Sequence, residues 1–261
     1  MSTIFQKIVE LEQNHIPAAL VTIIKTQGSV PRTVGTKMIV QLDGEIHGTI
    51  GGSTVEALVI EEAQTIIQTG QPRVVTHNLS DEFKQDTGMI CGGTLELFIE
   101  PILVPERVYI FGGGHVGFHV ASFVKHIGFE FIIIDDRPEF ASIDRFPDAL
   151  MRITDNPELV ATNLDLTKND YIVIVTHGHQ YDYEVLRSVI TKPARYIGMI
   201  ASTTKRDQIF HKLRTVDEIS DDFLSRIHSP IGIDIGAETP EEIAISIVAE
   251  LIKTRRIHQS F

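Results

Sequence analysis

Only one cysteine, Cys91, occurs among the 261 residues. A chain with a single cysteine forms no internal disulfide, and this usage agrees with a reducing compartment. The sequence also lacks the second cysteine that a Cys-x-x-Cys corner of a structural zinc site requires. Three catalytic strings are missing as well, namely a G-x-S-x-G elbow, a Walker A lysine and H-E-x-x-H. The sequence therefore offers no recognisable nucleophilic triad and no zinc-hydrolase motif.

Long apolar runs and an excess of basic residues are also absent. No run approaches the roughly 20 residues needed to cross a bilayer, and residues 1–13 lack the basic and apolar regions of a signal peptide. The chain has 23 basic and 35 acidic residues, a net charge of −12, whereas phosphate backbones demand basic stripes. We therefore expect a cytoplasmic protein with no nucleic-acid or membrane partner.

The most informative segment that is present runs from Val108 to Gly117, where an apolar stretch meets the string Gly-Gly-Gly-His-Val-Gly. Its spacing is G-x-G-x-x-G, in which the first glycine permits a tight turn, the second lets the backbone approach a diphosphate, and the third permits close packing of helix and strand. An anion then binds free N–H groups at a helix N-terminus. The residues expected at this ligand site are Gly112, Gly113, Gly114, His115 and Gly117.

Two carboxylates stand where such a site holds a ribose. A second apolar run, Phe129–Ile134, ends in Asp135 and Asp136, 23 and 24 residues after Gly112. A carboxylate that accepts ribose hydroxyls repels a 2′-phosphate, so any free dinucleotide bound here is expected to be NAD rather than NADP. The alternative is a Rossmann domain that folds this way without binding a nucleotide, because a fold does not fix a function.

The pattern of apolar residues predicts an α/β protein with two domains. Residues 1–102 read as a small N-terminal α+β domain, Pro101–Pro105 as the linker, and residues 106–261 as a Rossmann-like domain with a doubly wound parallel sheet. The strands expected are 18–24, 36–42, 45–50, 73–78, 95–99, 108–111, 129–134, 150–153, 171–175 and 196–200, and the helices 4–13, 54–69, 116–127, 182–190, 203–213 and one from Pro240.

The N-terminal domain contains two further glycine-bearing segments, 28–35 and 48–56. Gly51 and Gly52 run directly into a predicted helix, so their amides are candidates to receive an anion. Gly28 opens the other segment, in which Arg32 is a candidate to clamp an oxyanion with two donors. The alternative is that the glycines only serve tight turns and that the arginine is solvated.

Three other polar segments are candidates for ligand binding. Cys91 is followed by two glycines, and it is either a small buried hydrophobe or an accessible thiolate that ligates a soft metal. His177 and His179 follow a predicted strand at the sheet edge where α/β proteins bind ligands, so they are candidates to contact a bound ligand. The alternatives are that they face solvent or that, with Asp182, they hold a metal ion. Residues 202–206 add an N-cap and two cations, which fit either anion recognition or a solvated helix start.

Six strings together resemble the xanthine dehydrogenase accessory factor family (XdhC/CoxI): GSVPRTVGTKMIV, GTIGGSTVE, GMICGG, YIFGGGHVG, VTHGHQYD and PIGIDIGAETPEEIAISIVAE. The resemblance covers nearly the whole chain in the same order. It implies a non-catalytic chaperone that binds molybdenum cofactor (molybdopterin), assists its sulfuration with a cysteine desulfurase, and inserts it into a xanthine dehydrogenase-type enzyme of purine catabolism. It also implies a small N-terminal domain followed by a Rossmann domain.

One departure from the family pattern concerns the second string. Many relatives look like three glycines followed by cysteine there, whereas this chain has Ser53 and Thr54. Cys91 is then the only sulfur ligand that the chain offers to a metal. Molybdopterin presents a phosphate for a glycine turn and a metal-dithiolene centre that a thiolate can cap.

Two other classes of function compete with this interpretation. An NAD(P)-dependent oxidoreductase fits the glycine spacing and the two aspartates, although only His177 and His179 are available as proton donors. A nucleotide-sensing regulatory protein fits the same features. We also expect the protein to be a homodimer.

Overall fold

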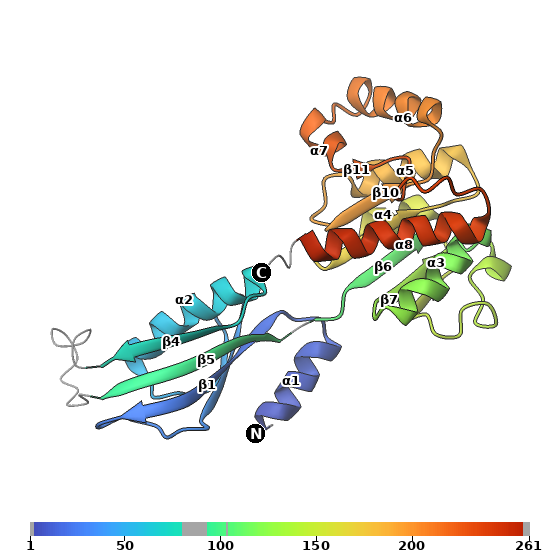
Figure 1. The fold of residues 1–261 in the computed structure, drawn as a ribbon. Coiled ribbons are helices and arrows are strands. Elements are labelled where there is room, and N and C mark those ends of the chain that lie inside the picture. Colours follow the sequence, from blue (N-terminus) through green and yellow to red (C-terminus); the bar gives the residue numbers. More distant parts are fainter. Residues whose placement is uncertain (1–2, 80–92, 103, 258–261) are drawn as a thin grey trace. The chain divides into compact units, whose positions relative to one another are not determined.

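A computed structural model describes residues 3–79, 93–102 and 104–257 of the chain. It divides into two compact units, an N-terminal unit of residues 1–104 and a C-terminal unit of residues 105–261 (Figure 1). Within the described residues, no helix combines the length and the apolar character that crossing a membrane requires.

The N-terminal unit is built on an antiparallel sheet with the strand order β3-β2-β1-β5-β4. Strands β2 and β3 form a hairpin on either side of Asp43-Gly44, where Gly44 has a φ of 89°. The elements of this unit are α1 (Ile4–Gln13), β1 (Ala18–Gln27), β2 (Lys37–Gln41), β3 (Ile46–Gly48), α2 (Ser53–Thr69), β4 (Arg73–Asn78) and β5 (Thr94–Ile102).

The two helices pack against opposite faces of this sheet. Alternate side chains of β1 and β5 point to opposite faces: Val21 and Leu97 pack with Val59 of α2, whereas Ala18 packs with Leu11 of α1. Gly70 ends α2 in the left-handed conformation with a φ of 69°, which glycine adopts without strain after a helix.

The boundary between the two units, after Val104, falls within the predicted linker Pro101–Pro105, but strand β5 extends into the first two residues of that linker. Pro101 belongs to β5, where it pairs with Ala19 of β1. On the other side of β5, pairing with β4 ends at Ile99, so the missing N–H of Pro101 costs no ladder hydrogen bond there. Strand β5 therefore continues further than a proline-based boundary suggests.

The C-terminal unit is a Rossmann-type domain with a six-stranded parallel sheet, which confirms the predicted fold class. Its strand order is β11-β10-β9-β6-β7-β8, so the chain reverses direction across the sheet between β6 and β9. Ligands of open α/β sheets bind at such a switch point, outside the carboxyl ends of the strands. The strands are β6 (Arg107–Phe111), β7 (Glu130–Ile134), β8 (Met151–Ile153), β9 (Asp170–Ile174), β10 (Tyr196–Met199) and β11 (Ile227–His228).

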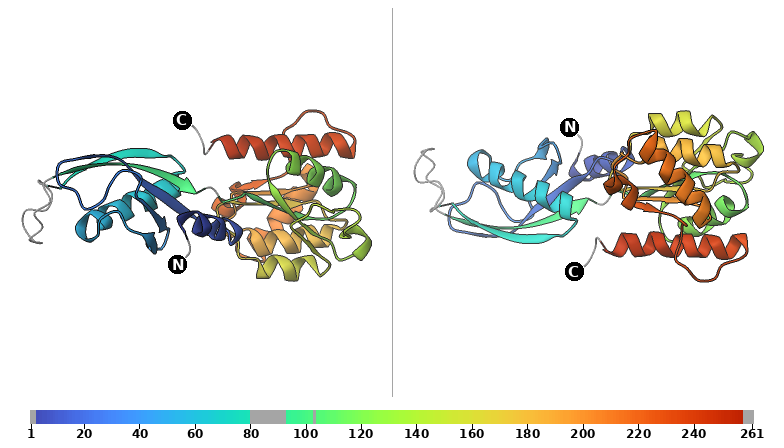
Figure 2. Two further views of the ribbon diagram at one scale, coloured as in Figure 1. Left: turned by 90° about the horizontal axis from the view of Figure 1, so that it is seen from below. Right: turned by 90° about the horizontal axis from the view of Figure 1, so that it is seen from above.

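Helices cover both faces of the parallel sheet (Figure 2). Helices α3 and α8 pack on one face, around Ile110 and Val173, while the residues of α5 and α6 pack on the other, around Phe111 and Ile172. The helices are α3 (His115–His126), a short 3-10 helix (Pro138–Phe140), α4 (Pro157–Asn163), α5 (His179–Val189), α6 (Thr203–Thr215), α7 (Asp221–Ser225) and α8 (Pro240–Ile257).

The predicted start of the last helix is confirmed in detail. The Thr239 hydroxyl accepts from the Glu242 amide at 3.3 Å, and a Glu242 carboxylate oxygen accepts from the Thr239 amide at 3.1 Å. This reciprocal pair is a capping box, and Pro240 takes the first helical position.

Candidate functional site

The glycine turn, residues 112–117, connects β6 to α3, and packing explains three of its glycines. A Cβ on Gly112, which has a φ of 114°, would collide with the Val175 carbonyl oxygen beyond β9. A Cβ on Gly113 would collide with the Phe140 carbonyl oxygen, and one on Gly117 with the carbonyl oxygen of Gly112. These three glycines are therefore required by the fold itself.

Gly114 differs from these three glycines. Its backbone is extended, with a φ of −66°, so Gly114 does not adopt the left-handed conformation that favours glycine, and among the described residues an added Cβ would meet no atom within 4 Å. Gly114 is the N-cap of α3, and no described side chain caps that helix end. Nothing in the described chain requires a glycine here, whereas a ligand that approaches the backbone would require one.

Asp135 follows β7, and hydrogen bonds saturate its carboxylate. One oxygen accepts from the Gly113 amide at 2.9 Å and from Nη2 of Arg137 at 2.9 Å. The other oxygen accepts from Nε of Arg137 at 2.9 Å and from the Arg137 amide at 3.1 Å. The side chain is only 1% exposed. Asp135 thus fixes the glycine turn to the end of β7.

These contacts also determine the charge of Asp135. Burial alone raises the pKa of the carboxyl, but the hydrogen bonds from Arg137 and from the Gly113 amide outweigh it, so the pKa lies below its usual value. The same pairing raises the pKa of Arg137. Asp135 is therefore a carboxylate at neutral pH, paired with a guanidinium.

Arg145, which no sequence motif marks, binds the carbonyl side of the same residue, Gly113. Its Nη2 donates to the Gly113 carbonyl oxygen at 2.9 Å. The guanidinium also lies over aromatic rings, with its Cζ 5.1 Å from the Phe118 centroid and 5.4 Å from that of Phe140. A lone arginine in a connection gives no sequence signal, because the turn that it contacts lies 32 residues away.

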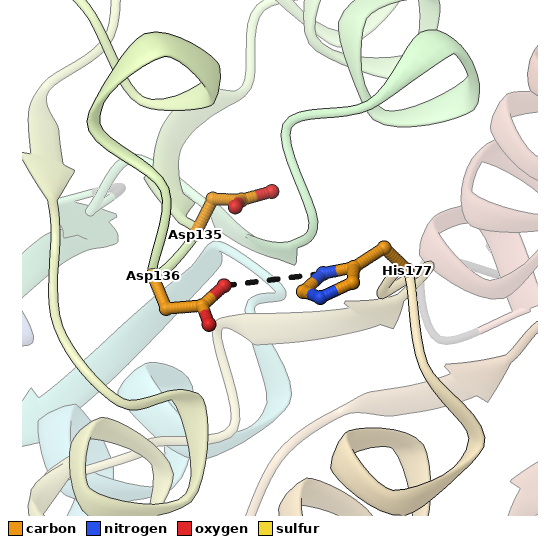
Figure 3. A group of neighbouring side chains, drawn as sticks. All are labelled: Asp135, Asp136 and His177. Carbon is orange, nitrogen blue, oxygen red and sulfur yellow. Dashed lines mark ion pairs between the residues drawn. The ribbon is translucent and has the colours of Figure 1, made fainter.

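Asp136 lies at the carboxyl edge of the sheet, at the switch point where a ligand crevice is expected, opposite residues that follow β9. Its Oδ2 accepts from the Tyr181 hydroxyl at 3.0 Å, which raises the pKa of that tyrosine. His177 Nδ1 lies 3.9 Å from Asp136 Oδ1, and Figure 3 shows the two side chains facing each other. Among the described residues, Oδ1 is buried without a hydrogen-bond partner. The predicted residues Asp136 and His177 are therefore brought together at one edge of the sheet.

Asp135, Asp136 and His177 also offer ligand atoms within 4.8 Å of one another, a spacing compatible with a metal ion. The charges argue against a cation there. Arg137 already places its guanidinium on both oxygens of Asp135, and a metal ion would have to compete with that positive charge. We therefore regard this group as an ion-pair network.

The lysine predicted as an anion-binding cation is engaged elsewhere. Lys205, in the first turn of α6, forms an ion pair with Asp182, whose side chain is 1% exposed. The other oxygen of Asp182 accepts from the Thr176 hydroxyl at 2.6 Å. This network positions the loop that carries His177, and Ser202 caps α6 as predicted, accepting from the Lys205 amide.

The N-terminal candidates gather at one end of the small sheet. Gly28 follows β1 with a φ of 76°, and a Cβ on Gly51 would lie 2.5 Å from Cγ of Pro31. A Cβ on Gly93, just before β5, would lie 2.6 Å from the Ser29 carbonyl oxygen. Segments 28–35 and 48–56 are thus neighbours, and Arg32 is exposed there.

The amides expected to receive an anion in this unit already have partners within the chain. The Gly51 amide donates to the Thr49 hydroxyl at 3.2 Å, and the Gly52 amide donates to a carboxylate. Oε1 of Glu56 accepts from the Gly52 amide at 2.9 Å and from the Ile50 amide at 3.1 Å. It also accepts from the Thr49 hydroxyl at 2.5 Å. Burial raises the pKa of Glu56, but these hydrogen bonds lower it further than burial raises it. The expectation that Gly51 and Gly52 offer free amides is therefore corrected.

Two predicted residues escape structural description. Cys91, the predicted metal ligand, lies outside the described residues. His179 is the first residue of α5, but its side chain is not described. His115, also predicted, is exposed at the first turn of α3.

Comparisons with known families match both parts of the chain. Residues 108–251 match the family described as the XdhC Rossmann domain, and residues 11–78 match the XdhC and CoxI family. A solved structure described as a xanthine dehydrogenase from Bacillus halodurans is similar, with a TM-score of 0.53 and 25% identity, covering 97% of this chain and 95% of that chain.

Curated relatives agree with these families. YqeB of Escherichia coli K12 is 32% identical over 253 residues, which are 97% of this chain and 46% of YqeB. A probable xanthine dehydrogenase subunit of Bacillus subtilis 168 is 32% identical over 163 residues, 62% of this chain and 47% of that protein. The molybdenum cofactor insertion chaperone PaoD of E. coli K12 is 22% identical over a region that covers 98% of this chain and 89% of the PaoD sequence. The chain thus spans just under half the length of the first two.

Proposed function

Because the chain belongs to the XdhC and CoxI family, we propose that it binds molybdenum cofactor and delivers it to a xanthine dehydrogenase-type enzyme. The observation that carries the proposal is Gly114, a glycine that the fold does not require, at the uncapped N-terminus of α3. Molybdopterin ends in a phosphate, and a helix N-terminus behind a glycine turn suits that group.

Similarity to an insertion chaperone over nearly the whole chain supports the same function. We further propose that Cys91 caps the metal, that a cysteine desulfurase sulfurates the bound cofactor, and that the protein acts as a cytoplasmic homodimer. An NAD(P)-dependent oxidoreductase remains the alternative, favoured by the G-x-G-x-x-G spacing. The saturation of Asp135 weighs against it, since that carboxylate is not available to a ribose.

The first experiment measures retained cofactor. The protein is purified from a molybdenum-replete host and denatured, and the released ligand is identified as pterin, nicotinamide or neither. The molybdenum content per protein is measured in parallel. Wild type is expected to release pterin. Cys91→Ala is expected to keep its circular dichroism spectrum and lose molybdenum, whereas unchanged molybdenum in a folded variant would refute the role of the thiol.

The second experiment measures delivery. A xanthine dehydrogenase apoenzyme is reconstituted with cofactor, with and without this protein, and hypoxanthine oxidation is followed. The protein is expected to raise the yield of active enzyme and to form no NADH by itself. Substrate-dependent NADH formation without the apoenzyme would replace the chaperone proposal with the oxidoreductase.

A further inference from the structure

We propose that Arg137 and Tyr181 close the nucleoside half of this crevice, so that the glycine turn accepts a ligand ending in a phosphate monoester and excludes nucleoside diphosphates. The inference rests on the proposed function in that it names the ligand class of the same site. Two contacts within the C-terminal unit carry it, one on each of the aspartates that the sequence offers to a ribose.

Arg137 occupies the position of the ribose diol. In dinucleotide-binding Rossmann domains, the carboxylate after the second strand accepts the ribose hydroxyls. Here the fork of Arg137 donates to both oxygens of Asp135, at 2.9 Å each, and the Gly113 amide adds a third bond. Arg137 is itself held, because its Cζ lies 3.8 Å from the centroid of the Phe140 ring. A ribose would therefore have to displace a bidentate ion pair.

Tyr181 forms a bridge across the crevice. Asp136 follows β7 and Tyr181 lies in the first turn of α5 after β9, and these strands flank β6 on either side. Two strand spacings separate β7 from β9, about 10 Å, so the 3.0 Å hydrogen bond from Tyr181 to Asp136 crosses above the end of β6. The His177 ring packs edge-on against Tyr181 at 5.5 Å and faces Asp136 (Figure 3). Oδ2 of the second aspartate is thus engaged by Tyr181, while its Oδ1 is buried and faces His177.

The phosphate half of the site has no such closure. Gly114 has open space above its Cα among the described residues, and α3 has no acidic residue in its first turn and no side-chain cap. Its dipole and free N–H groups favour a terminal phosphate dianion. The site therefore combines an accessible position for a phosphate with a nucleoside position that is blocked by protein side chains.

The test uses ADP-ribose as the nucleoside diphosphate probe and inorganic phosphate as the minimal anion. ADP-ribose is titrated calorimetrically into wild type, Tyr181→Phe and the double variant Arg137→Ser/Tyr181→Phe. Wild type is expected to bind ADP-ribose with a Kd of about 1 mM or weaker, and the double variant at least about tenfold more tightly, because two hydroxyls then reach a carboxylate. Phosphate should raise the melting temperature of all three proteins.

Matched controls come from the same helix. Tyr183 donates to Asp217 at 2.6 Å and Arg187 to Glu158 at 2.5 Å, so Arg187→Ser/Tyr183→Phe removes equivalent contacts away from the crevice. This control should not gain affinity for ADP-ribose. Tyr181→Phe keeps the aromatic ring and the ion pair between Arg137 and Asp135, so it remains informative if the double variant unfolds. Its affinity for ADP-ribose should increase, but by less than that of the double variant.

Three results would overturn the inference. The first is micromolar binding of ADP-ribose, NAD or NADP by wild type, and the second is no gain in either folded variant. The third is the absence of any phosphate response in wild type. Failure of the proposed function is distinguishable, because it is read from pterin and molybdenum content of the purified protein, which these titrations do not measure.

Discussion

Each unit of this protein contains a glycine turn that leads into a helix, and the two turns treat the helix N-terminus in opposite ways. Before α2, the amides of Ile50 and Gly52 donate to the carboxylate of Glu56, which lies in the first turn of α2. Before α3, the amide of Gly113 is the one that donates to Asp135, and an added Cβ on Gly114 would meet no described atom within 4 Å. The first turn is satisfied by a carboxylate of its own helix, whereas the second has open space at Gly114, where we propose that a ligand binds.

The comparison shows what distinguishes a glycine turn whose amides the chain itself satisfies from the turn that we propose to bind a ligand. Both contain consecutive glycines ahead of an apolar helix, so the glycines alone predict an anion site in each. The difference lies in the first helical turn, where α2 has Glu56 and α3 has no acidic residue. A carboxylate at a helix N-terminus satisfies the same N–H groups that would otherwise bind an external anion.

The largest expected effect comes from Gly117→Ala. Its new Cβ would collide with the backbone oxygen of Gly112, which cannot move without breaking the turn. We expect a loss of about 3 kcal/mol or more in the free energy of unfolding of the C-terminal unit. Urea denaturation followed by circular dichroism measures it. A loss below about 1 kcal/mol would show that the turn repacks easily.

Gly114→Val should separate binding from folding. The position has ordinary dihedral angles and space for a side chain, so the free energy of unfolding should change by less than about 1 kcal/mol. Retention of cofactor should be abolished, because the side chain occupies the place of the phosphate. Equal pterin content in wild type and variant would make the turn structural.

A suitable control for this variant is Gly128→Ala at the other end of α3. Gly128 has a φ of 81°, so alanine is strained there and should cost about 1 kcal/mol. Cofactor content should stay at the wild-type level. Loss of cofactor in this control would attribute the effect of Gly114→Val to stability.

Glu56→Gln tests the closed turn. The change keeps the shape of the side chain but removes the charge that strengthens its bonds to Thr49, Ile50 and Gly52. We expect a loss of about 1–2 kcal/mol in the stability of the N-terminal unit at neutral pH. Glu61→Gln, at an exposed position of the same helix, should be neutral. Equal stability of both variants would mean that the carboxylate is dispensable.

The smallest effect concerns acidification. The folded-state pKa values of Glu56 and Asp135 lie below their usual values, so both carboxylates stabilise the fold fully above their unfolded pKa values of about 4. That contribution is lost as the pH falls through the folded pKa values. The stability difference between wild type and Glu56→Gln should therefore shrink below about pH 4 in thermal melts. A constant difference down to pH 3 would contradict the role of the charge.

Most of the fold could be predicted from the sequence because local signals and burial agree. The stripe of α2, the capping box of α8 and the alternation of apolar strands with helices in the C-terminal unit each indicated the observed element. Helix α4 was missed although Asn156 caps it and Pro157 opens it, the same signature that identified α8. Strand β11 has two residues, too few for any periodicity.

The candidate site was predictable only in part. The spacing identified Gly112, Gly114 and Gly117, and the carboxyl ends of two strands placed Asp136 and His177 near each other. The partners that decide the state of each aspartate, Arg137 and Tyr181, follow from side-chain geometry, which a spacing rule does not contain. The same limit applies to Glu56, whose carboxylate turns back onto the preceding loop.

The place of α8 in the core has a consequence for how the chain is made. Residues 244–251 of this helix complete the apolar layer that contains β6 and α3, and Glu250 anchors the loop at Gly232 through a 2.8 Å bond. During synthesis, the part of this sheet face that α8 covers therefore stays exposed until α8 leaves the ribosome. The N-terminal unit, whose described core lies within residues 1–104, completes its own packing earlier. Newly made chains thus pass through a stage with one finished unit and one sheet face that α3 alone covers.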